Sequence, residues 1–161
     1  MENKEYRVAV YLRVASKCDF AIENQKTAMQ RFVAEKGYIN VEFYSDNGYN
    51  GLNFNRPAFI QMDNDIKAGL IDVVVIKDIS RISRNNLQFG EWLDDMHSKK
   101  VKVISVNDNF DSENYNPINL SFLEAIKKYY KENHSQRIKY GIALSRQRKL
   151  EQTAKNQGNL S

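Results

Sequence analysis

Residues 71–85, IDVVVIKDISRISRN, join the clearest strand pattern in the chain to a polar turn that carries two arginines. Ile71 to Ile76 is a short apolar run rich in β-branched residues, which predicts a buried strand. Lys77 to Asn86 is polar and predicts a loop, after which apolar residues recur at helical spacing. A buried strand followed by a loop and a helix is typical of an α/β fold.

The same alternation runs through the first 106 residues. Strands are expected at 7–12, 41–44, 71–76 and 101–106, with residues 108–117 as a polar connector. Helices are expected after Asp19 and Asn55, each acting as the N-cap, and after Asn86. The pattern predicts an α/β fold with a mostly parallel sheet of four to five strands and helices on both faces.

The predicted fold indicates where two sets of side chains should lie. The last of the expected helices should turn four large apolar residues inward: Phe89, Trp92, Leu93 and Met96. Ligands of parallel sheets bind beyond the carboxyl ends of the strands. Four polar residues would lie at that edge: Arg13, Ser16, Asp46 and Arg81.

Composition limits the class of protein. The 161 residues are 42% hydrophobic and 27% charged, which suits one globular domain with a core. No apolar run is long enough to cross a bilayer, and the N-terminus lacks the features of a signal peptide. The single cysteine, Cys18, excludes an internal disulfide and a multi-cysteine zinc site. These features favour a cytoplasmic protein without a membrane partner.

Charge is distributed unevenly along the chain. Residues 1–126 carry 15 Lys and Arg against 18 Asp and Glu, whereas residues 127–161 carry 9 against 2. A mildly acidic body with a basic tail is typical of a chain that presents one face to a polyanion. A solvated, lysine-rich helix would give the same asymmetry.

From about Ile118 the pattern becomes one long helical stretch with an apolar stripe among Lys and Arg. No strand follows to pack beneath the stripe, so it is expected to contact another subunit, DNA or both. The expected organisation is an α/β domain at 1–116, a long basic helical region at 117–155 and a tail at 156–161.

Four arginines stand at the expected functional edge of the sheet: Arg13, Arg56, Arg81 and Arg84. A guanidinium is always protonated and matches phosphate oxygens with a fork of donors. Such a cluster would hold a phosphodiester and neutralise the charge that grows during phosphoryl transfer. For any one of these arginines taken alone, an ordinary surface contact is the favoured explanation, whereas for the set at the functional end of the sheet phosphate binding is favoured.

Other kinds of site lack support. The glycine-rich phosphate loops G-x-G-x-x-G and G-x-x-x-x-G-K-[ST] are both missing from the sequence. His97 and His134 stand singly, and the aspartates show no metal-loop spacing. We therefore expect no metal and no cofactor.

Several motifs follow one another along the chain: Tyr-x-Arg-Val at 11–14 with a serine following, IENQ at 22–25, DNGYNG at 46–51, NRPAF at 55–59 and VIKDISRISRN at 75–85. In this order they resemble the catalytic domain of serine recombinases, the resolvase/invertase family. The match runs from about Tyr6 to Val106 and is closest to the large, transposon-type members. Ser80 stands where many compact members carry an aspartate, and Asn50 where a serine is common.

The resemblance implies site-specific recombination of double-stranded DNA through a covalent 5'-phosphoserine, by a homodimer that assembles to a tetramer on DNA. Arg13, Arg81 and Arg84 would bind and activate the scissile phosphate, with Arg56 supporting them. It further implies polar or supporting roles in the site for three residues: Gln25, Asp72 and Tyr11.

For the long helix, the resemblance implies a dimer contact and a reach into the DNA minor groove. Its candidate DNA-binding residues are Arg137, Lys139, Arg146, Arg148 and Lys149, and Arg137 is also a candidate contributor to the active site. Members of this family read their target with a separate downstream domain, so the chain is expected to be a fragment.

The nucleophile departs from the family pattern. The family usually has serine directly after Arg-Val, where this chain has Ala15. Counting back from Gln25 instead places Ser16 at the nucleophile position, and Ser16 is the favoured nucleophile. Cys18 is expected to be a half-buried spectator. Two alternatives stay open: an inactive relative that binds DNA or regulates, and an unrelated α/β signalling or ligand-binding module.

Overall fold

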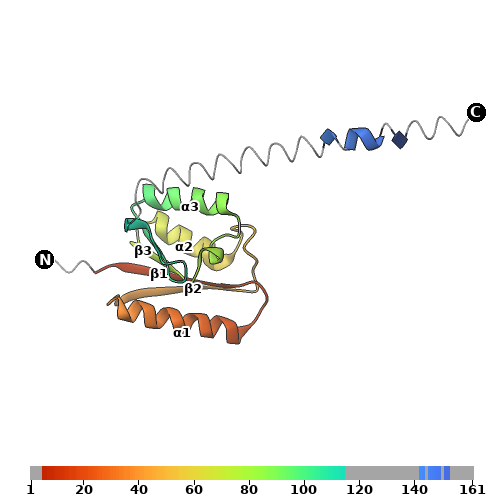
Figure 1. Ribbon diagram of the computed structural model, residues 1–161. Coiled ribbons are helices and arrows are strands. Elements are labelled where there is room, and N and C mark those ends of the chain that lie inside the picture. Colours follow the sequence, from red (N-terminus) through yellow and green to blue (C-terminus); the bar gives the residue numbers. More distant parts are fainter. Residues whose placement is uncertain (1–4, 115–141, 144, 150, 153–161) are drawn as a thin grey trace, which may run out of the picture. The chain divides into compact units, whose positions relative to one another are not determined.

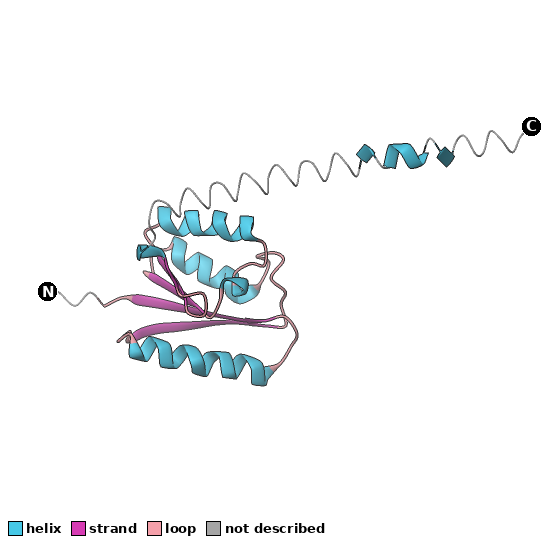
Figure 2. Ribbon diagram, in the orientation of Figure 1, coloured by secondary structure: helices cyan, strands magenta, loops and turns pink. Residues whose placement is uncertain are grey.

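The computed structural model describes residues 5–114 together with 142–143, 145–149 and 151–152. Residues 5–114 form a five-stranded sheet in the order β2-β1-β3-β4-β5, with α1 on one face and α2 and α3 on the other (Figures 1 and 2). The elements are β1 Arg7–Val14, α1 Asp19–Glu35, β2 Asn40–Asn47, α2 Pro57–Lys67, β3 Val73–Ile76, η1 Ile79–Arg81, α3 Asn86–Ser98, β4 Lys102–Ser105, β5 Phe110–Asp111 and η2 Ser112–Asn114.

The pairing of the strands confirms the predicted α/β fold with a mostly parallel sheet. β1 lies between β2 and β3 and is parallel to both, and β4 extends the sheet parallel to β3. β5 is antiparallel to β4, with Phe110 opposite Ser105. The polar connector expected at 108–117 therefore contains a short strand that was not predicted, since a strand of two residues leaves no periodic pattern in a sequence.

Burial of the central strand explains why it anchors the fold. Every residue of β1 from Val8 to Val14 is buried. Val8, Val10 and Leu12 pack in one cluster with Ile22 and other apolar residues of α1. Because side chains alternate along a strand, the residues between them face α2 and α3, and the Tyr11 ring meets the Phe59 ring of α2 edge to face.

The second strand is longer than predicted. Strand pairing with β1 continues to Val14 opposite Asn47, so Asp46 and Asn47 belong to β2 and not to the following loop. Asp46 is only 2% exposed. Its carboxylate can be buried because it accepts hydrogen bonds from the Tyr11 hydroxyl (2.7 Å) and from the backbone N–H groups of Ala58 (2.9 Å) and Phe59 (3.0 Å).

Two of the expected helix caps were wrong. The N-cap residue of α2 is Arg56, with Pro57 in the first turn, and the free N–H groups of that turn are satisfied by Asp46 and not by Asn55. The N-cap residue of α1 is Cys18, so Asp19 lies inside the helix. In both cases the end of a neighbouring strand determines where the helix begins. The sequence does not show which strand end lies there.

The third helix agrees with its pattern. The Asn85 side chain caps α3 by accepting from the N–H groups of Leu87 and Gln88. The four residues expected to face inward are buried, which confirms that prediction: Phe89, Trp92, Leu93 and Met96.

Most of the expected long basic helix and the tail at 156–161 fall outside the described residues. Within 142–152, the described residues are helical and exposed. No helix in the described part of the chain has the length and apolarity needed to cross a bilayer.

We predict that Asp46→Ala lowers the free energy of unfolding by about 2–4 kcal/mol, because two N–H groups and a buried hydroxyl lose their acceptor. Urea denaturation followed by far-ultraviolet circular dichroism measures the loss. Asp65→Ala is the matched control, since Asp65 accepts one hydrogen bond from the Tyr44 hydroxyl in a less buried place. Equal losses in the two variants would contradict the proposed capping by Asp46.

Candidate active site

The loops that follow β1, β2 and β3 lie at one edge of the sheet, because the three strands are parallel and adjacent. These loops carry Ser16, the glycine-rich segment 48–56 and the turn 77–85. The structure brings the four expected arginines together at this edge. Gly51 lies between two of them, since a Cβ atom added there would be 2.9 Å from Arg13 Nη2 and 3.2 Å from Arg84 Cγ.

Arg13 points into the protein and not into solvent, with 1% of its surface exposed. Its Nε donates to the Arg81 carbonyl (3.0 Å), Nη1 to the Tyr49 carbonyl (2.8 Å) and Nη2 to the Ser80 carbonyl (2.6 Å). All three nitrogens of the guanidinium are thus bound to backbone oxygens. A buried charge requires such partners, and here they come from two different loops.

Arg56 is buried to the same degree and binds the same turn. Its Nη1 donates to the Tyr11 hydroxyl and to the Arg81 carbonyl, both at 2.8 Å, and Nη2 donates to the Ile82 carbonyl at 2.5 Å. Its Cζ lies 4.7 Å from the centre of the Phe59 ring, a favourable cation–π distance. Arg13 and Arg56 therefore hold the carbonyls of three consecutive residues, 80–82.

Burial lowers the pKa of Arg13, and the nearby charges of Arg56, Arg81 and Arg84 lower it further. Burial also lowers the pKa of Arg56, while Tyr11 and Asp46 oppose this effect. An arginine keeps its proton even so, because its ordinary pKa is far above neutrality. The edge of the sheet is therefore a concentrated positive charge.

Tyr11 links Arg56 to Asp46, since its hydroxyl accepts from Arg56 Nη1 and donates to Asp46 Oδ2. Burial is the main cause that raises the pKa of Tyr11 well above its usual range, and the hydrogen bond to Asp46 adds to it. The phenol is therefore a neutral donor at physiological pH, and its role is to orient its two neighbours.

The backbone of Arg13 is held from the other face of the sheet. Gln25 of α1 accepts from the Arg13 N–H (3.1 Å) and donates to the Arg13 carbonyl (3.2 Å). The same carbonyl accepts from Arg81 Nη1 (2.7 Å), while Arg81 Nε pairs with Asp78 (3.2 Å). Arg81 is half-buried, so only part of its guanidinium is covered.

Two side chains at this edge are exposed: Ser16 and Arg84. Within the described residues, neither the Ser16 hydroxyl nor the Arg84 guanidinium has a hydrogen-bond partner. The Arg84 backbone is nevertheless fixed, because its N–H donates to the Gly51 carbonyl (3.1 Å). Cys18 is exposed and not half-buried as expected, and so are all the residues from 15 to 20.

A family model described as the N-terminal domain of resolvase matches residues 8–150. The chain belongs to the resolvase family. One similar solved structure is the C-terminal catalytic domain of ISC1926 TnpA, an IS607-like serine recombinase, which is 27% identical with a TM-score of 0.56 and covers 62% of this chain and 68% of that one. The N-terminal catalytic domain of TP901-1 integrase superposes with a TM-score of 0.71 and is 27% identical, covering 79% of this chain and 98% of that domain.

A resolvase family site-specific recombinase from Streptococcus pneumoniae superposes with a TM-score of 0.73 and is also 27% identical, covering 86% of this chain and 96% of that one. A resolvase from Clostridium perfringens is 28% identical over 102 residues, which are 61% of this chain and 53% of the relative. A Bacillus subtilis relative is 24% identical over 136 residues, and the chain spans only 27% of it. The chain thus spans about half or less of the length of these two relatives.

Asp72 does not belong to the cluster, and the expectation that it would was wrong. It precedes β3, at the opposite end of the sheet, where it accepts from Arg7 Nε and Nη2, each at 2.9 Å. The Arg7 N–H also donates to it (3.0 Å). This pairing joins the start of β1 to the start of β3 and serves the fold of the resolvase domain.

The candidate DNA-binding residues are only partly described. Arg137 and Lys139 lie outside the described residues. Arg146, Arg148 and Lys149 are exposed on a helical segment. Contact between these residues and DNA stays a prediction.

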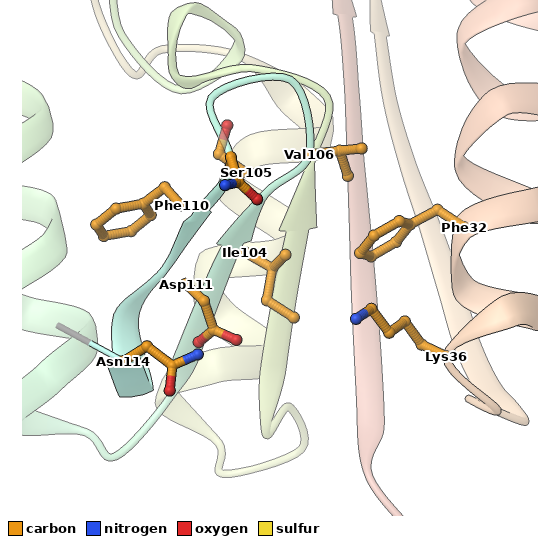
Figure 3. Close-up of a pocket in the computed structure, with 9 residues that line it drawn as sticks. Phe32, Lys36, Ile104, Ser105, Val106, Phe110, Asp111 and Asn114 are labelled. Atoms are coloured by element: carbon orange, nitrogen blue, oxygen red, sulfur yellow. The ribbon is translucent and has the colours of Figure 1, made fainter.

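Outside the arginine cluster, a pocket of about 460 Å³ lies between the last turns of α1 and the β4–β5 edge (Figure 3). Phe32 and Lys36 line it from one side and Ile104 and Phe110 from the other. None of the expected site residues reaches it. No cluster of three or more metal-ligating side chains occurs among the described residues.

Sequence reasoning missed what surrounds the arginines. Gly51 and Phe59 were not expected in the site, and Asp46 was placed at the edge without a role. The available signal was the segment DNGYNG at 46–51, whose glycines mark a close approach of backbone. The group that approaches the Gly51 backbone is the side chain of Arg13, which lies 38 residues earlier in the chain.

We predict a steep loss of stability above pH 9 that depends on Tyr11. A raised pKa in the folded state adds stability that is complete below the unfolded pKa, about 10, and is lost as pH rises towards the folded value. In urea denaturation at pH 8 to 11.5, Tyr11→Phe should be less stable near neutrality but should lose stability less steeply, by up to about 1.4 kcal/mol per pH unit. Tyr49→Phe, which changes an exposed ring, should keep the wild-type slope, and the same slope in Tyr11→Phe would refute the prediction.

We also predict that Arg56→Lys lowers the free energy of unfolding by about 2–4 kcal/mol, because one ammonium cannot reach the Tyr11 hydroxyl and two carbonyls together. Thermal and urea denaturation measure the change. Arg31→Lys on the exposed face of α1 is the control and should leave stability unchanged. A small effect at position 56 would show that the guanidinium fork is dispensable.

Proposed function

We propose that this domain cleaves and rejoins double-stranded DNA at a specific site, with the Ser16 hydroxyl as nucleophile. The Ser16 Oγ–P bond forms as the bond from phosphorus to the 3' oxygen breaks. The hydroxyl proton leaves Ser16 and a proton is taken up by the 3' oxygen, which gives a 5'-phosphoserine and a free 3'-hydroxyl. Resealing is the reverse reaction on a new 3' end, so no oxidant and no energy source are needed.

The observation that carries the proposal is an exposed serine in the loop after β1, at the same edge of the sheet as a cluster of four guanidiniums, in a chain of the resolvase family. A pentavalent phosphorus transition state carries extra negative charge on its outer oxygens. Arginine donors fixed in advance stabilise that charge without reorganisation. Arg84, which is exposed, and Arg81, which is half-buried, are assigned to those oxygens.

Arg13 and Arg56 are assigned to positioning. A direct contact between Arg13 and the phosphate, implied by the resemblance, would require its guanidinium to leave three carbonyls. In the described arrangement the two buried arginines instead hold the turn from which Arg81 and Arg84 project. Gln25 and Tyr11 orient Arg13 and Arg56 in turn.

Ala15 supports one alternative. An alanine directly after Arg-Val has no nucleophilic group, so a catalytically inactive resolvase-like protein that binds DNA or regulates is the second candidate. The two candidates make the same prediction for DNA binding and differ only in the covalent intermediate.

For the whole protein we propose double-stranded DNA as substrate and a homodimer that assembles to a tetramer on DNA. Residues 117–155 are assigned to dimerisation and to DNA contact through five residues: Arg137, Lys139, Arg146, Arg148 and Lys149. The cytoplasm of a bacterial host, where such DNA is found, is the proposed location.

We predict that Ser16→Ala abolishes a covalent protein–DNA adduct, because the attacking oxygen is removed. The substrate is a pool of randomly nicked duplexes from the DNA that flanks the gene, since a nick beside the cleaved bond traps the intermediate. Adducts are scored by denaturing electrophoresis, and peptide mass spectrometry identifies the modified residue.

Arg84→Ala should lower the adduct rate by roughly 10²-fold or more, in line with the loss of one transition-state donor, and should leave folding intact. Ser98→Ala, an exposed serine at the end of α3, is the control and should form adducts at the wild-type rate. An unchanged adduct in Ser16→Ala would refute the nucleophile. Salt-dependent DNA binding with no adduct in the wild type would favour the inactive relative.

A further inference from the structure

The three residues 15–17, here called the serine loop, are attached on both sides to the end of β2, at Asn47 and the two residues that follow it. At the start of the loop, the Val14 carbonyl accepts from the N–H groups of Gly48 (2.9 Å) and Tyr49 (3.1 Å). At its end, the Cys18 N–H donates to Asn47 Oδ1 (2.8 Å). Since Ser16 has no hydrogen-bond partner of its own in the described residues, these attachments determine where its hydroxyl lies.

Asn47 makes the attachment at the α1 end with both halves of its side-chain amide. Oδ1 accepts from the Cys18 N–H, and Nδ2 donates to Asp19 Oδ1 (2.7 Å). The N-cap residue Cys18 provides no side-chain hydrogen bond to its own helix. Asn47 therefore takes over the task of fixing the first turn of α1 relative to the end of β2.

The neighbouring glycine packs against the serine loop. Gly48 has a φ of +92°, and a Cβ atom there would lie 3.3 Å from the Cβ of Lys17. A side chain at this position would press on the serine loop from the β2 side. Asn47 and Gly48 thus both position the serine loop. Asn47 does so through its hydrogen bonds, and Gly48 does so because it has no side chain that would press on the loop.

We infer that Asn47 is a positioning residue for Ser16. The inference rests on the proposed function, because it concerns the delivery of the Ser16 hydroxyl to a phosphate held by Arg84 and Arg81. Displacement of a reacting group by about 1 Å can lower a rate by two orders of magnitude. Release of the serine loop from β2 permits displacements of that size, whereas the arginine cluster has its own separate attachments.

The test compares Asn47→Ala with Asn53→Ala. Asn53 is an exposed asparagine whose side chain bonds, within the described part of the chain, only the nearby Asn55 N–H, so Asn53→Ala is a matched control. The adduct assay above gives the first-order rate at saturating DNA, and a separate titration gives DNA affinity. Asn47→Ala should lower the rate roughly 10- to 100-fold with affinity unchanged, and Asn53→Ala should change neither.

A rescue separates positioning from general damage. Asn47→Asp places a second carboxylate against Asp19 and should be impaired. Adding Asp19→Asn puts an amide donor at position 19 opposite the carboxylate acceptor at position 47, so the two groups have changed places. The double variant should recover most of the rate. A loss of rate that tracks a loss of folded protein or of DNA affinity would overturn the inference.

Loop order can be measured without any reaction. Cys18 is the single cysteine of the chain and is exposed, so a nitroxide attached to it reports mobility beside the serine loop. Asn47→Ala should increase the mobility of the label and Asn53→Ala should not; unchanged mobility would overturn the inference. If the wild-type protein forms no adduct, the proposed function and the catalytic part of the inference both fail, while the label still decides whether Asn47 holds the loop.

Discussion

A guanidinium that is removed from water must find acceptors inside the protein, and in this domain two of them must do so side by side. Arg13 and Arg56, each about 1% exposed, share the carbonyls at the end of η1. This need for acceptors inside the protein constrains other parts of the domain. β3 must end early enough for its following turn to fold back over β1, and residue 51 must lack a side chain.

The same requirement gives the candidate site two layers. In the inner layer, Arg13 and Arg56 donate hydrogen bonds to backbone oxygens. In the outer layer, Arg81 and Arg84 project from the turn that Arg13 and Arg56 hold. Tyr11, Asp46 and Gln25 belong to the inner layer, since each bonds to Arg13, to Arg56 or to a partner of theirs. An arrangement of this kind keeps the outer guanidiniums in place before a ligand arrives, which is where preorganised electrostatics is most effective.

The apolar strand runs at 7–12 and 71–76 and the helical spacing after Asn86 were sufficient to predict the parallel sheet, its helices and the gathering of four arginines at one edge. Burial of Arg13 could not be predicted, because its acceptors lie 36 to 68 residues away along the chain. The cap on α2 could not be predicted for the same reason, because Asp46 supplies it and a loop separates Asp46 from the start of that helix.

Asp72 is an instructive error. The family resemblance suggested a place in the site, although strand direction alone argues against it: Asp72 comes before its strand, and the site follows the strands. Local pattern and parallel pairing were the better guide here. Conversely, no local pattern distinguishes Asn47, whose partners Cys18 and Asp19 become neighbours only when β1 and β2 have paired.

The hydrogen bonds from Arg13 to residues 80 and 81 bear on how the polypeptide is made. A growing chain that has left the ribosome only as far as the end of β3 already contains the hydrophobic residues of three strands and two helices, yet its buried cations still lack the carbonyls of residues 80–82. Assembly of this corner must wait until the segment after Ile76 emerges. Contacts of such sequence separation are formed slowly, so the reactive edge matures after the hydrophobic core has begun to collapse.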